Sequence, residues 1–168
     1  MMKSLFILFL SFVLSLSVHA QNDCSCCDET HSQFDFWVGE WIVLDSLGEK
    51  VGDSQISQIE DNCIILEHWR GIKGGTGSSF NYYDQSDSTW NQLWIDNNGS
   101  ILKLKGHGEP DRMVLKSDLQ EGTSMDGFYN QITWSSHRDG TVTQLWEILD
   151  RDGTPIRTLF LGTYHRKE

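Results

Sequence analysis

The sequence predicts an all-β domain of about ten antiparallel strands, preceded by a short helical turn. Short runs with period-two alternation, rich in Val, Ile, Thr and aromatic residues, follow one another along the chain and are separated by Gly, Asn and Asp. No stretch keeps a helical apolar period over the ten or more residues that a helix requires. The 168 residues, 38% hydrophobic and 22% charged, suit one globular domain. Strands of this number and spacing fit a meander barrel or a sandwich.

The first twenty residues have the features of a secretory signal peptide. Lys3 precedes an apolar run over 5–13, and Val18-His19-Ala20 resembles a small-residue cleavage site. The apolar run is too short to be a stable membrane anchor, so we expect a secreted or periplasmic protein. The expected parts of the chain are a signal peptide (1–20), a cysteine-bearing leader (21–33) and one β-domain (34–168).

All four cysteines follow the expected cleavage site, at positions 24, 26, 27 and 63. An oxidising compartment favours disulfides. A bridge between the neighbours Cys26 and Cys27 strains the backbone, so we expect one of the three leader cysteines, most simply Cys27, to pair with Cys63. The alternative is a thiolate site for a soft metal, formed by the leader cysteines beside His31. We assign no metal on this pattern.

A single helical turn is expected within 29–36, and the strands follow it. The expected strand ranges are 40–46, 53–60, 63–70, 76–83, 89–96, 100–106, 112–118, 127–136, 141–149 and 156–166.

The turn at Asn97-Asn98-Gly99 sets the pairing of two of these strands. A two-residue turn would place Trp94 on the same face as Lys103, whereas a three-residue loop with Gly99 in the left-handed conformation aligns Trp94 with Leu102. We favour the second register, which leaves Lys103 and Lys105 in water. It gathers on one face Trp90, Gln92, Trp94, Leu102, Leu104 and Gly106.

Four short motifs together resemble a secreted, lipocalin-like family of the calycin superfamily. They are FDFWVGEW over 34–41, WNQLWID over 90–96, QLWE over 144–147 and FLGTY over 160–164. The resemblance covers roughly 34–167 and implies a closed, single antiparallel meander barrel. The family has no established reaction, so the resemblance implies no activity. It also implies that Trp41 closes the bottom of the barrel beneath a basic side chain of the last strand, Arg166 or Arg157.

A polar side chain two positions from a tryptophan recurs on several expected strands. Such a pair lies on one face of its strand, and a barrel of this size can hold one small molecule. We therefore predict a binding cavity for a small, partly polar ligand. Its expected lining is Glu67, Trp69, Trp90, Gln92, Trp94, Trp134, Gln144 and Trp146. The alternatives are an interior packed solid by these side chains, or an exposed aromatic face that binds carbohydrate or protein.

The hypothesis that the protein is an enzyme rests on Glu67. Apolar tryptophan side chains near this carboxyl group would raise its pKa, so that it serves as the acid or base of an isomerase or lyase. His68 cannot share its pocket, because adjacent strand residues point to opposite faces. The hypothesis of haem binding would require His165 as the iron ligand. This side chain points out of the barrel if Phe160 and Tyr164 point into it. We assign no cofactor.

The net charge of the chain limits the classes of molecule that it is expected to bind. Thirteen Lys and Arg stand against 24 Asp and Glu, giving a net charge of −11 at pH 7. Phosphate backbones and anionic lipid surfaces both require clustered cations, so we expect a small-molecule partner and neither nucleic acid nor a membrane surface.

Overall fold

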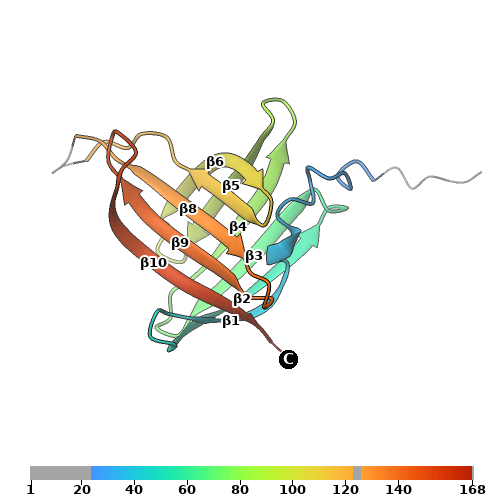
Figure 1. Cartoon of the computed structure of the whole chain (residues 1–168), viewed down its shortest axis with the longest axis horizontal. Helices are drawn as coiled ribbons and strands as arrows, with labels where there is room; N and C mark the ends of the chain where they lie inside the picture. Colours follow the sequence, from blue (N-terminus) through green and yellow to red (C-terminus); the bar gives the residue numbers. More distant parts are fainter. Residues whose placement is uncertain (1–23, 123–125, 168) are drawn as a thin grey trace, which may run out of the picture.

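A computed structural model describes residues 24–122 and 126–167 of the protein as a closed antiparallel β-barrel. Each strand pairs with its sequence neighbours, and β1 pairs with β10 to close the sheet (Figure 1). The elements are a 3-10 turn, η1 (Asp35–Trp37), and the strands β1 (Gly39–Leu44), β2 (Lys50–Ile59), β3 (Ile64–Gly71), β4 (Thr76–Asp84), β5 (Thr89–Asp96), β6 (Ile101–Glu109), β7 (Arg112–Lys116), β8 (Tyr129–Ser136), β9 (Val142–Leu149) and β10 (Pro155–Arg166).

The all-β prediction is confirmed, and the closed sheet decides for a barrel over a sandwich. Each expected strand range overlaps one strand of the structure, and the largest differences are at the start of β2 and the end of β6. The expected signal peptide lies outside the described residues. Within the described ranges, no helix has the length and apolar character needed to cross a membrane.

The predicted register between β5 and β6 is also confirmed. Trp94 pairs with Leu102, and Gly99 has a φ of +80° in the connecting turn. Leu104 is buried inside the barrel, whereas Lys103 and Lys105 are exposed. The left-handed glycine sets the loop length, and the loop length decides which side chains enter the barrel.

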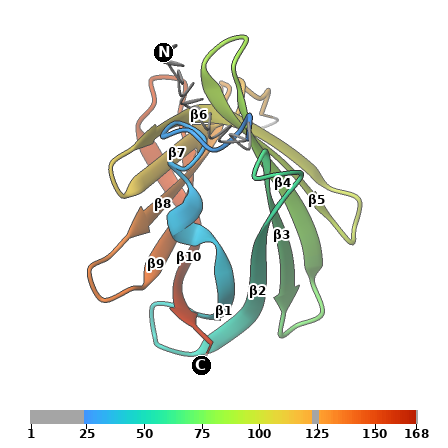
Figure 2. The ribbon, with the colours of Figure 1, turned by 90° about the vertical axis from the view of Figure 1, so that its right-hand side faces the viewer.

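An aromatic plug, formed by Phe34 and Trp37, closes one end of the barrel. Both side chains are fully buried, and their rings stack with centroids 5.0 Å apart. Phe34 also contacts the rings of Trp90 and Trp134, at 5.8 and 5.1 Å. Figure 2 shows the N-terminal segment crossing this end of the barrel before it enters β1. The plug therefore fills the part of the interior that lies nearest to η1.

Arg166 on the last strand lies over the indole of Trp41, with its guanidinium carbon 4.4 Å from the ring centroid. Its Nη1 also donates a hydrogen bond to the carbonyl oxygen of Val38, at 3.2 Å. The buried Trp41 indole N–H donates to the carbonyl of Trp37, at 2.9 Å. Of the two arginines expected over Trp41, the structure selects Arg166. This contact joins the end of β10 to the start of β1, where the barrel closes.

Two disulfides tie the leader together, and their pairing corrects one expectation. Cys26 pairs with Cys63 in the β2–β3 turn, and Cys27 pairs with Cys24. The expected bridge between Cys27 and Cys63 is therefore wrong. The physical reason is a turn at residues 25–26, which brings the Cα atoms of Cys24 and Cys27 to 5.4 Å and leaves Cys26 facing the hairpin. Because all four cysteines are oxidised, they offer no thiolate for a soft metal.

Candidate functional site

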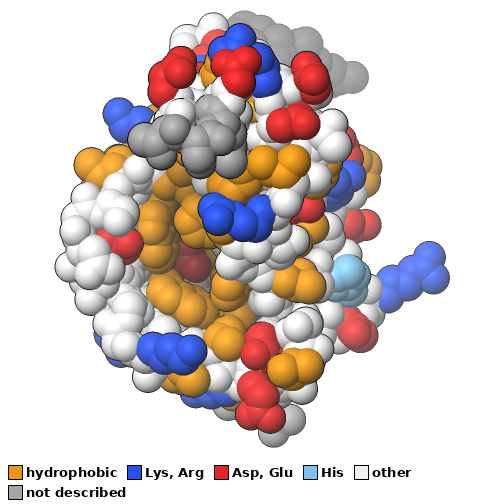
Figure 3. Space-filling view, turned by 90° about the vertical axis from the view of Figure 1, so that its left-hand side faces the viewer, with side chains coloured by type: hydrophobic (Ala, Val, Ile, Leu, Met, Phe, Trp, Pro, Cys, Tyr) orange, Lys and Arg blue, Asp and Glu red, His pale blue; other side chains and the backbone are white. Residues whose placement is uncertain are grey.

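The barrel contains a cavity of about 240 Å³ in the part of its interior away from the plug. In Figure 3 it is a hollow lined by hydrophobic side chains, with an acidic side chain at its base. Glu67 is the one acidic residue among the described residues that line it. The full lining is Glu67, Trp69, Gln92, Trp94, Leu102, Ile132, Gln144, Trp146, Leu159, Phe160 and Tyr164.

Six of the eight side chains expected at a ligand site meet in this cavity. They are Glu67, Trp69, Gln92, Trp94, Gln144 and Trp146. The structure places the other two, Trp90 and Trp134, in contact with the plug, where both are buried against Phe34. Alternation along a strand identifies the inward face correctly for these two tryptophans. It does not specify their depth along the barrel axis, and depth decides whether a side chain meets the plug or the cavity.

The sequence reasoning omitted the contribution of β10 to the lining. Phe160 and Tyr164 share a strand face, so their alternation was a usable signal. Leu159 gave no such signal, because a shift in the β9–β10 register between Thr158 and Phe160 lets neighbouring residues both reach the cavity. A bulge of this kind breaks the period-two pattern and bends the strand.

Glycines on neighbouring strands make room for the cavity's aromatic rings. A Cβ on Gly52 would lie 2.4 Å from the ring of Trp69, and one on Gly77 would lie 2.3 Å from the ring of Trp94. Trp69 also meets Phe160 edge to face, with centroids 6.1 Å apart. The aromatic walls therefore depend on backbone without side chains on β2 and β4.

Glu67 lies at the base of the cavity and is only 5% exposed. The hydroxyls of Ser54 and Ser79 donate hydrogen bonds to its two carboxyl oxygens, at 2.9 and 3.0 Å. Burial raises the pKa of Glu67 from 4.5 to about 7, and the two serine hydrogen bonds oppose part of that increase. The group can therefore exist in either protonation state near neutral pH.

A chain of hydrogen bonds extends from this carboxyl group across β4 to β5. The Asn81 amide nitrogen donates to the Ser79 hydroxyl at 3.0 Å and to the Ile65 carbonyl at 2.9 Å. The Gln92 amide nitrogen in turn donates to the side-chain oxygen of Asn81, at 2.8 Å. Each step donates toward Glu67, so the network holds the carboxyl group in place as an acceptor.

A second polar group lies on β9 and β10. The Tyr164 hydroxyl donates to the side-chain oxygen of Gln144. Burial, with the nearby Glu67 charge as a second cause, raises the pKa of Tyr164 well above its ordinary value, so the phenol stays protonated. On β9 the Trp146 indole N–H donates to Asn130 at 2.9 Å. With its oxygen engaged, Gln144 can offer its amide N–H groups to a ligand.

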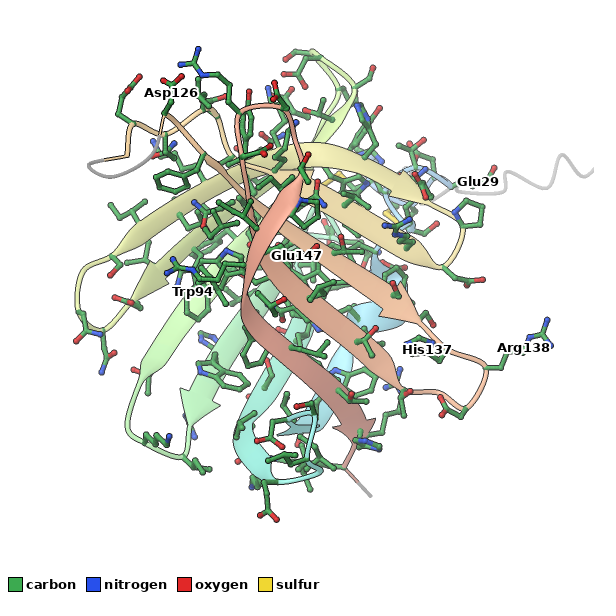
Figure 4. The ribbon with its side chains drawn as sticks, turned by 60° about the vertical axis from the view of Figure 1, so that its left-hand side comes forward. Glu29, Trp94, Asp126, His137, Arg138 and Glu147 are labelled. Atoms are coloured by element: carbon green, nitrogen blue, oxygen red, sulfur yellow. A yellow bond between two sulfur atoms is a disulfide. The ribbon has the colours of Figure 1, made fainter. Side chains whose placement is uncertain are left out.

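His68 and His165, the two histidines considered for acid–base or haem chemistry, lie outside the cavity. His68 follows Glu67 on β3 and its ring bonds to the Ser78 hydroxyl at 2.9 Å on the outer surface. His165 is exposed, next to the inward-facing Tyr164. In Figure 4, His137 lies near the β8–β9 turn, away from Trp94 on β5. The described histidines thus give the cavity no imidazole to ligate a metal or haem.

The cavity combines indole and phenyl walls with a carboxyl group, two amides and a phenol. Such an arrangement can hold a small molecule by apolar contact and fix its orientation through a few hydrogen bonds. No protein-family model matches the chain, and no curated protein matches its sequence.

Proposed function

We propose that the protein is a secreted or periplasmic, lipocalin-like barrel that binds a small molecule non-covalently in its cavity. The observation that carries this proposal is the cavity of about 240 Å³, which is walled by aromatic rings and has a buried carboxyl group at its base. A solidly packed interior would leave no such space, and scattered surface tryptophans would not converge. The motif resemblance to secreted lipocalin-like proteins agrees with this assignment.

A thermal-shift screen of a small-molecule library, with native mass spectrometry of the hits, tests the proposal. A bound ligand stabilises the folded state by mass action, by about 2.7 kcal/mol at a hundred times its Kd, so a hit should raise Tm by several degrees and give a one-to-one adduct. Leu102→Trp fills the cavity and should abolish the shift. Lys103→Gln, on the adjacent outward position, should preserve it. The proposal would be overturned if neither the compound library nor an extract of the source cells yielded a ligand.

Export is the second part of the proposal. The two disulfides fit a compartment outside the reducing cytosol, and the first twenty residues have the three regions of a signal peptide. Intact-mass analysis of protein exported by its own leader should give a chain that begins near Gln21. Recovery of the full-length chain in the reducing cytosol, with free thiols, would contradict export.

A second candidate function is acid or base catalysis by Glu67 on a bound isomerisable or eliminable substrate. The observation that favours it is the pKa of about 7 in a cavity able to hold a substrate. Incubating each screening hit with the protein and analysing the mixture by chromatography and mass spectrometry distinguishes the two. A product that forms with the native chain and not with Glu67→Gln supports catalysis, whereas unchanged hits support binding alone.

A further inference from the structure

Glu67 is a buried carboxyl group without a positively charged partner among the described residues. None of the six ion pairs in the described ranges includes it, and the cavity lining contains no Lys, Arg or His. The strands beside it present Ser54 from β2 and Ser79 from β4, both neutral hydroxyls. The one other titratable group facing the cavity is Tyr164 on β10, which stays protonated. Once it loses its proton, a buried carboxyl group is stabilised by a paired cation, and in this cavity a cationic ligand would supply that cation.

The base of the cavity is richer in acceptors than in donors on the side of β3 to β5. A carboxylate has about four acceptor positions, and the two serines use one on each oxygen of Glu67. Gln92 donates one of its two amide N–H groups to Asn81, which leaves its carbonyl oxygen and one N–H group for a ligand. A primary ammonium group carries three donors and no acceptor, and therefore complements this side.

The walls suit the remainder of such a ligand. The indoles of Trp69, Trp94 and Trp146 line the cavity with Phe160, and aromatic faces attract cations as well as flat apolar groups. The net charge of −11 also favours the approach of a cation over that of an anion.

The volume limits the size of the ligand. About 240 Å³ is below the roughly 300 Å³ at which drug-sized pockets begin. A single ring with a short side chain suits a cavity of this size.

We propose that the cavity binds a small organic cation, a primary amine on a short chain attached to an aromatic ring, with its ammonium group beside Glu67 and its ring against the indoles. This inference rests on the proposed function, because it specifies the ligand class of the same cavity.

Three probes of one shape and different charge test it: phenethylamine, 2-phenylethanol and phenylacetate. Calorimetric titration at pH 8 and low salt should give an affinity for the amine at least tenfold above that for the alcohol, with the anion weakest. Glu67→Gln keeps the side-chain shape without the charge, and should reduce amine affinity at least tenfold while changing alcohol affinity less than threefold. Glu40→Gln removes one negative charge from an exposed position on β1 and should change neither.

A pH series on the native chain gives an independent readout that does not require the variant to fold. The amine stays protonated between pH 5 and pH 8, so its affinity should fall as Glu67 gains a proton below about 7, and alcohol affinity should stay level. Equal binding of amine and alcohol at both pH values would overturn the cation assignment and leave the binding function standing. Binding of no probe at millimolar concentration would also overturn this inference, while the library screen separately decides the binding function.

Discussion

The indole of Trp94 on β5 lies against the bare backbone of Gly77 on β4. A Cβ at Gly77 would be 2.3 Å from Cζ2 of the ring and 2.9 Å from the backbone oxygen of Ile95. Both distances are below van der Waals contact, so a larger residue at position 77 requires both the ring and the backbone of β5 to move. The ring is part of the cavity wall, and therefore the shape of the cavity depends on a residue that does not line it.

Gly77→Ala should destabilise the fold by about 1–3 kcal/mol, the usual cost of overpacking, and displace Trp94. Urea unfolding gives the free-energy change, and the tryptophan emission maximum reports the displaced ring. Gly75→Ala is the matched control, because a Cβ there has no atom within 4 Å, and its effect should stay within about 0.5 kcal/mol. Equal effects of the two substitutions would contradict the close packing at Gly77.

The pKa of Glu67 predicts a pH-dependent stability. Its folded-state pKa of about 7 exceeds the ordinary value of 4.5, so between these pH values the folded protein retains a proton that the unfolded chain has lost. The free energy of unfolding should therefore fall as pH rises from about 4.5 to about 7, by at most about 3 kcal/mol, and then level off.

Glu67→Gln removes this titration, so its stability relative to the native chain should be greatest above pH 7. Denaturant unfolding at half-unit pH intervals measures the difference between the two chains. Glu40→Gln, at an exposed position, should follow the native curve. Parallel curves for Glu67→Gln and the native chain would show that Glu67 titrates normally.

The guanidinium of Arg166 over Trp41 should contribute to barrel closure. Arg166→Ala removes the cation–π contact and the hydrogen bond to Val38, and should lower the free energy of unfolding by about 1–2 kcal/mol. Arg157→Ala changes an exposed arginine on the same strand and should stay within about 0.5 kcal/mol. Thermal and urea unfolding measure the stability of the two variants. A larger loss of stability in Arg157→Ala than in Arg166→Ala would contradict the assignment of Arg166 to the contact with Trp41.

The two disulfides should differ in their contributions. The Cys26–Cys63 bridge closes a sequence separation of 37 residues, whereas Cys24–Cys27 closes one of 3. Chain-entropy arguments give about 4 kcal/mol for the longer loop and about 2 kcal/mol for the shorter. Replacing both cysteines of the long-range bridge with alanine should therefore lower the free energy of unfolding more than replacing both cysteines of the local bridge. Urea unfolding of the two double variants measures the difference. Equal losses would contradict this order.

Local chemistry predicted the faces of the strands correctly, as Trp94 and Leu102 show. The left-handed Gly99 fixes the loop, and the loop fixes which alternate side chains point inward. The same rule placed Gln92 and Gln144 correctly, since each is two positions from a tryptophan that faces the cavity.

The depth of a side chain along the barrel axis and the pairing of the cysteines depend on contacts between distant segments. The local sequence pattern does not contain this information. Trp134 faces inward as expected, but the plug residue Phe34 occupies its end of the barrel. Leu159 reaches the cavity because of a register shift against β9. The pairing of Cys26 with Cys63 follows from the turn of the leader over the β2–β3 hairpin, which spacing alone could not reveal.

Among the described residues, the stacked rings of Phe34 and Trp37 close one end of the barrel, and the cavity is open on the face shown in Figure 3. Leu159 lines the cavity and is 41% exposed, so it lies between the cavity and the solvent. We therefore expect side chains near the solvent to set the rates of ligand association and dissociation. Side chains at the base of the cavity should set which ligand binds.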